Sequence, residues 1–99
     1  MSGIFNVNEL ADNKYTIGFN QDLYDKAKEN TPFKEMPSYN IISARVLGVT
    51  YAEFLRWARD NYNGIIKGKG NKYPLIVFDN KNDCRACCLF LTRRLNGLA

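Results

Sequence analysis

The chain has 99 residues and a mass of 11.4 kDa, with 45% hydrophobic residues, 24% charged residues and a formal net charge of +4. This length and composition exclude a fibrous or intrinsically disordered protein and predict one small globular unit. No apolar run approaches the roughly 18–20 residues of a membrane span, so we expect no membrane partner. The N-terminal residues lack the basic start and apolar stretch of a secretory signal, which predicts a cytoplasmic location.

The charges are unevenly distributed along the chain. Residues 1–39 carry four lysines and six acidic residues, whereas residues 40–99 carry ten lysines and arginines and four acidic residues. A basic excess confined to one part of a chain favours a polyanionic partner. We therefore divide the chain into an N-terminal appendage, residues 1–39, packed on a basic domain, residues 40–99.

Histidine is absent, so the chain lacks the commonest general base and the commonest metal ligand. Its cysteines, Cys84, Cys87 and Cys88, are too few for a four-ligand zinc site. Together with Leu91 and Leu95 they fall on one face of a helix, which predicts that they belong to the core. No nucleophile has an evident base and no carboxylate pair has catalytic spacing, so we expect no enzyme activity, no catalytic residues, no metal and no cofactor.

The N-terminal third predicts a strand followed by a helix. Residues 15–19, YTIGF, alternate with the period of a strand, and Asp12-Asn13 before them fits a turn. Asn20 fits the N-cap of a short helix over residues 20–30. Residues 31–38 contain two prolines and fit a connector.

Residues 40–47, NIISARVL, are compatible with two structures. Their β-branched residues favour a strand, whereas Ala44 and Leu47 fit a short helical face. Gly48 ends the segment in either case.

The clearest helix follows Thr50 and runs to Tyr62. Thr50 fits its N-cap, and Glu53 stands at the position that completes a capping box. Phe54, Trp57 and Ala58 give it an apolar stripe with helical spacing.

Two short strands, Ile65-Ile66 and Leu75–Phe78, flank a glycine-rich basic turn over residues 68–72 and predict a hairpin. Pro74 has no backbone N–H to donate, so we expect this to be an edge hairpin. A last helix is predicted over residues 82–96.

The order from residue 40, namely short helix, glycine turn, second helix, basic hairpin and closing helix, resembles a winged helix-turn-helix domain. The similarity is to the domains of excisionases and mercury-resistance-type regulators, and the matching stretch is SARVLGVTYAEFLRWAR. In that motif a small residue, here Ala44, lets the helices approach, and Gly48 takes a positive φ in the turn. A small core between the helices is expected from Leu47, Val49, Phe54 and Trp57. Residues 40–96 are covered by the resemblance, which implies an α+β fold whose wing spans Ile65 to Phe78.

The sequence departs from the motif at four positions, of which Tyr51 and Glu53 are unusual residues for the second helix. Ser43 stands where an apolar residue is usual, and Leu55 is expected on the exposed, base-facing side of the second helix. An apolar base-facing side argues for a protein partner rather than for base recognition.

The resemblance implies that the second helix enters the major groove, where Arg56 and Arg59 reach guanine edges or phosphates. Cations on the hairpin and on the first helix are then expected to contact phosphates. The complete set of DNA-binding candidates is Arg45, Thr50, Tyr51, Arg56, Arg59, Lys67, Lys69 and Lys72. The alternative for each of these residues is a solvated position on a basic surface.

Three functions remain open from the sequence. The first is a non-catalytic double-stranded DNA-binding protein, such as a phage or mobile-element transcription regulator or recombination accessory factor, which we expect to bind as a dimer or cooperatively. The second is a protein-interaction factor, such as an inhibitor of a host enzyme or a virion subunit, supported by Leu55 and Tyr51 on an exposed face. The third is RNA binding, with Tyr62 and Tyr73 available for stacking.

Overall fold

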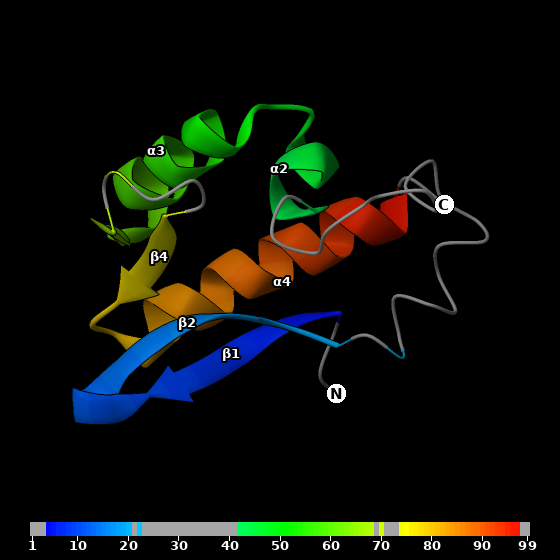
Figure 1. Cartoon of the computed structure of the whole chain (residues 1–99). Helices are drawn as coiled ribbons and strands as arrows, with labels where there is room; N and C mark the ends of the chain where they lie inside the picture. Colours follow the sequence, from blue (N-terminus) through cyan, green and yellow to red (C-terminus); the bar gives the residue numbers. More distant parts are fainter. Residues whose placement is uncertain (1–3, 21, 23–41, 69, 71–73, 98–99) are drawn as a thin grey trace.

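A computed structural model of the chain describes residues 4–20, 22, 42–68, 70 and 74–97 (Figure 1). These residues form a four-stranded antiparallel sheet and three α-helices, so the α+β class is confirmed. The elements are β1 (Phe5–Leu10), β2 (Lys14–Phe19), α2 (Ile42–Leu47), α3 (Tyr51–Tyr62), β3 (Ile65–Lys67), β4 (Leu75–Phe78) and α4 (Lys81–Gly97). In Figure 1, α4 lies between the β1–β2 hairpin and the α2–α3 pair. Among the helices described, none has the length and apolar character needed to cross a membrane.

The N-terminal hairpin is formed by β1 and β2, which pair in register from Phe5 opposite Phe19 to Leu10 opposite Lys14. The predicted turn is confirmed: Asp12 and Asn13 both have a φ near +60°, a conformation that these two residue types tolerate better than most. The sequence predicts β2 but makes no assignment for β1. The helix and connector predicted over residues 20–38 lie almost wholly outside the described residues.

The sheet order is β1-β2-β4-β3, so β4 is an inner strand. As expected from Pro74, the start of β4 is not in a central position: Leu75 pairs with Lys67 of β3, β2 does not reach it, and the β3–β4 hairpin lies at one edge of the sheet. Strand β2 reaches only the last two residues of β4, pairing Tyr15 with Phe78 and Thr16 with Val77. Pro74 precedes this paired region, so its missing N–H removes no bond between β2 and β4. Ile65 through Lys67 pair with the other edge of β4, as the predicted hairpin requires.

The α2–α3 corner resolves the ambiguity of residues 40–47 in favour of a helix from Ile42 to Leu47. Gly48 ends α2 with a φ of 73°, and its N–H donates to the Arg45 carbonyl at 3.0 Å while the Val49 N–H donates to the Ala44 carbonyl at 3.1 Å. This pair of bonds is a Schellman motif, which needs a left-handed residue at the position of Gly48. The turn conformation predicted from the sequence is therefore confirmed.

Helix α3 begins with the predicted capping box. The Glu53 N–H donates to the Thr50 hydroxyl oxygen at 3.2 Å, and the Thr50 N–H donates to the Glu53 carboxylate at 3.3 Å. The helix ends at Asn63, which is left-handed with a φ of 58°. Both ends of α3 are thus set by local residues.

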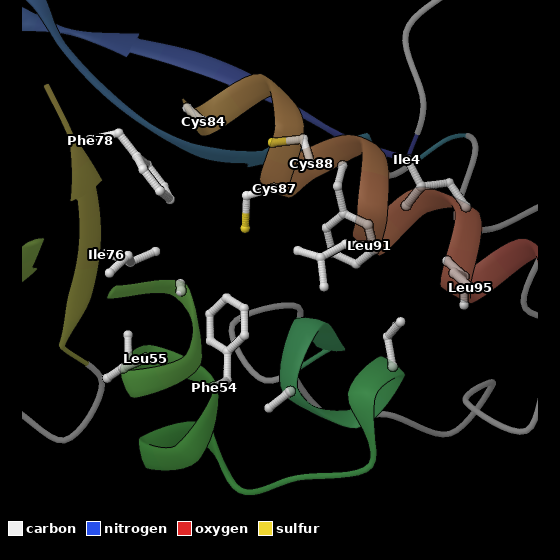
Figure 2. Close-up of a cluster of buried hydrophobic side chains, with 14 residues drawn as sticks. Ile4, Phe54, Leu55, Ile76, Phe78, Cys84, Cys87, Cys88, Leu91 and Leu95 are labelled. Atoms are coloured by element: carbon white, nitrogen blue, oxygen red, sulfur yellow. The ribbon is translucent and has the colours of Figure 1, made fainter. Parts of the chain in front are cut away.

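Helix α4 supplies much of the core (Figure 2). Its buried side chains are Cys84, Cys87, Cys88, Leu91 and Leu95, so the predicted core face is confirmed. They pack with Phe54 from α3, Phe78 from β4 and Ile4 near the start of the chain. Thr92 adds a polar link, because its hydroxyl accepts from the Phe5 N–H and donates to the Phe5 carbonyl, both at 3.3 Å.

Gly64 fills a position that has no room for a side chain. It is buried, and a Cβ built there meets Ile76 Cδ1 at 2.6 Å and the Ala58 carbonyl oxygen at 3.3 Å.

We expect Gly64→Ala to lower the free energy of unfolding by about 1–3 kcal/mol, because the methyl group overpacks the core. Urea denaturation measures this change. The matched control is Gly97→Ala, whose methyl group meets nothing within 4 Å, and equal stability of the two variants would contradict the expectation.

Burial raises the pKa of Cys87 from its ordinary 9.0 to about 12. At alkaline pH the unfolded thiol loses its proton while the folded thiol keeps it, so we expect stability to fall as pH rises above 9.0. One such thiol contributes a slope of about 1.4 kcal/mol per pH unit. Urea denaturation between about pH 8 and about pH 10, roughly one unit on either side of the ordinary thiol pKa, should give a shallower dependence of stability on pH for Cys87→Ala than for the unsubstituted chain. Equal slopes would be inconsistent with a buried neutral thiol.

Candidate nucleic-acid interface

The outer face of α3 is electrically balanced. Its exposed charged residues are Glu53, Arg56, Arg59 and Asp60, two of each sign. Arg59 Nε donates to Asp60 Oδ1 at 2.9 Å, which raises the pKa of Arg59 and lowers the pKa of Asp60. Of the two arginines predicted to reach DNA, Arg59 is therefore occupied by a neighbouring carboxylate.

Arg56 lies between two carboxylates without a direct ion pair to either in the described part of the chain. The Glu53 pKa is lowered chiefly by hydrogen bonds from Thr50 and to a smaller extent by the positive charge of Arg56. Arg56 also helps to lower the Asp60 pKa. Its side chain is exposed, so it is the α3 cation most available to an external anion.

Thr50 and Tyr51 form hydrogen bonds within the fold. The Thr50 hydroxyl donates to Glu53 Oε1 at 2.9 Å while it accepts the Glu53 N–H. The Tyr51 hydroxyl donates to the Pro74 carbonyl at 2.5 Å, and burial raises the pKa of this phenol. Tyr51 thus fastens the start of α3 to the residue that precedes β4.

Leu55 is not on an exposed, base-facing side, so that expectation is wrong. Its side chain is buried, with 4% of its surface exposed, and lies toward β4 near Ile76 (Figure 2). Helix α3 contacts α2, α4 and both hairpin strands, so its buried face is wider than the single stripe inferred from Phe54 and Trp57. With Leu55 buried, it gives no support to a protein partner at the base-facing side.

The structure brings part of the predicted site together. Arg45, Thr50, Tyr51 and Glu53 line a shallow hollow at the α2–α3 corner, where Arg45 is exposed. Lys67 is exposed at the end of β3, and Gly68 and Gly70 follow with φ values of 79° and 100°. Lys69 and Lys72 lie outside the described residues.

A surface feature that the sequence interpretation missed lies on α4. Leu89 and Phe90 are 47% and 43% exposed. A signal for them exists, because the run CCLFL, residues 87–91, is longer than one face of a helix can bury.

In the described part of the chain, no group of three or more histidine, cysteine or acidic residues is arranged to hold a metal ion. Comparisons with protein-family models, with curated proteins and with solved structures found no match.

We expect Tyr51→Phe to destabilise the protein by about 0.5–1.5 kcal/mol, because it removes the hydrogen bond to the Pro74 carbonyl. Urea denaturation gives the difference. Tyr62→Phe is the control, since no hydrogen bond of the Tyr62 hydroxyl occurs among the described residues. If both substitutions lower the free energy of unfolding by the same amount, the Tyr51 hydrogen bond does not stabilise the fold.

Proposed function

We propose that this chain is a small, non-catalytic, double-stranded DNA-binding protein of winged helix-turn-helix type. The observation that carries the proposal is the arrangement of α2, the Gly48 turn, α3 and the β3–β4 hairpin around one core. Strand β2, which precedes the helix pair, runs beside β4, so the helices and the hairpin are held on one sheet. In this proposal α3 faces the major groove and the hairpin follows the adjacent backbone.

The available cations favour contacts to phosphates over contacts to bases. Arg45, Arg56 and Lys67 are exposed on three successive elements, α2, α3 and β3. Glu53 and Asp60 offset the charge of the α3 face, and Arg59 is paired. Phosphate contacts position a protein on duplex DNA without reading its sequence, so we propose that the protein positions or bends DNA, as a transcription regulator or recombination accessory factor of a phage or mobile element does.

Titration with mixed-sequence duplex DNA tests this proposal. A shift in the electrophoretic mobility of the duplex reports binding, rather than the fluorescence of Trp57, the single tryptophan, because the ring of that residue packs against Phe90 of α4. We expect submicromolar affinity at about 50 mM salt and a loss of at least about tenfold at about 200 mM, because binding through phosphates releases counterions. Absence of binding at the lower salt concentration would overturn the proposal.

Two substitutions on α3 assign the contact. Arg56→Ala should weaken binding and reduce the slope of log affinity against log salt by about one, whereas Arg85→Ala on α4 should change neither. Asp60→Asn should strengthen binding, because it removes a negative charge and releases Arg59. If Arg85→Ala weakens binding as much as Arg56→Ala does, the contact is not on α3.

A further inference from the structure

The exposed apolar side chains of α4 continue onto α3. Leu89 and Phe90 are nearly half exposed, although large apolar side chains usually prefer the core. The Phe90 ring lies 5.5 Å from Trp57, and Trp57 lies 5.1 Å from Tyr62. The apolar surface therefore crosses from one helix to the next.

Arginines frame this surface without being neutralised. Arg85 and Arg93 stand four residues before and after Leu89, about 6 Å along the helix axis in each direction. Both are exposed, and neither forms an ion pair in the described part of the chain. The carboxylate of α4, Asp83, is half-buried and accepts a hydrogen bond from Asn63 Nδ2 at 3.4 Å. We call Arg85, Leu89, Phe90 and Arg93 the α4 patch.

We propose that the α4 patch docks an acidic amphipathic helix of another protein. Apolar residues of that helix would cover Leu89 and Phe90, and carboxylates one turn to each side would pair with Arg85 and Arg93. The proposal goes beyond DNA binding, because it uses none of the cations Arg45, Arg56 and Lys67.

Charge argues against the α4 helix of a second copy as the occupant. If two α4 helices meet antiparallel at Leu89, Arg85 of one faces Arg93 of the other, and in the parallel arrangement each arginine faces its own equivalent. Like charges held directly opposite each other are destabilising. Duplex DNA offers anions for the arginines but no apolar surface to cover Leu89 and Phe90. An acidic amphipathic helix supplies both.

The probe is a synthetic amphipathic helical peptide with leucine and phenylalanine on one face and glutamates one turn before and after them. Its control has lysine at each glutamate position. We expect the acidic peptide to bind saturably with one-to-one stoichiometry and to change Trp57 fluorescence, because Phe90 contacts that ring. We expect the lysine peptide to bind at least about tenfold more weakly, a difference of about 1.4 kcal/mol. Equal binding of both peptides, or no saturable binding of the acidic one, would overturn the proposal.

Matched substitutions locate the contact. Leu89→Ser should weaken peptide binding at least about tenfold, the effect of losing an interface hot spot, whereas Leu75→Ser should leave it unchanged. Leu75 is equally exposed, at 46%, but lies on β4. Because both positions are exposed, both variants should fold, which circular dichroism checks.

Two substitutions of charged residues distinguish this proposal from the DNA-binding proposal. Arg93→Glu should abolish peptide binding and spare DNA binding, whereas Arg56→Ala should weaken DNA binding and spare peptide binding. Peptide binding and DNA binding are therefore tested separately, and the loss of one does not imply the loss of the other. Concentration-dependent dimerisation that Leu89→Ser abolishes would assign the patch to a second copy and overturn the acidic partner.

Discussion

Two pairs of residues join the two β-hairpins into one sheet. Tyr15 and Thr16 on β2 pair with Phe78 and Val77 on β4, and no other register connects the N-terminal hairpin to the β3–β4 hairpin among the described strands. Thr16 strengthens this short joint, because its buried hydroxyl donates to the Ile76 carbonyl at 2.6 Å. A buried hydroxyl without a partner would cost free energy, so the bond both satisfies Thr16 and fixes the strands.

The rest of the structure follows from this joint. With β2 beside β4, one continuous sheet supports the core, and the cysteine face of α4 packs within it. The hairpin in turn fixes α3, because Leu55 packs toward β4 and Tyr51 binds the Pro74 carbonyl. These contacts use much of the α3 surface. The part of α3 that remains exposed to a ligand is narrow and carries charges of both signs. Among the described residues, exposed positive charges without a paired carboxylate lie instead at Arg45, at Lys67 and on the α4 patch.

Features that depend on neighbours in sequence could be predicted from the sequence. The Thr50–Glu53 capping box, the left-handed Gly48, the β4 boundaries and the core face of α4 all rest on residues within a few positions of one another. Pairing between distant strands could not be predicted in this way. No local pattern states that β2 lies beside β4: Pro74 correctly excluded the start of β4 from a central position, but nothing near it in the sequence identified the strand that pairs with Val77 and Phe78.

In the candidate site, too, local properties could be predicted from the sequence and properties set by distant contacts could not. The exposure of Arg45, Arg56 and Lys67 agrees with their charge, whereas the burial of Leu55 depends on how many elements surround α3. The pairing of Arg59 with Asp60 joins neighbours in sequence, but two adjacent opposite charges in a helix need not meet, since successive side chains point in different directions. Its consequence for DNA binding could be recognised only from the side-chain geometry.

The bond between Thr92 and Phe5 spans 87 positions of the chain. Contacts of such large sequence separation are formed slowly, because a long loop must close before they stabilise anything. During synthesis the β1–β2 hairpin emerges well before either β4 or α4. An isolated hairpin is marginally stable in water, and until its neighbours arrive Phe5 and Ile4 have no core to enter. The β1–β2 hairpin therefore enters its core only after β4 and α4 have been made.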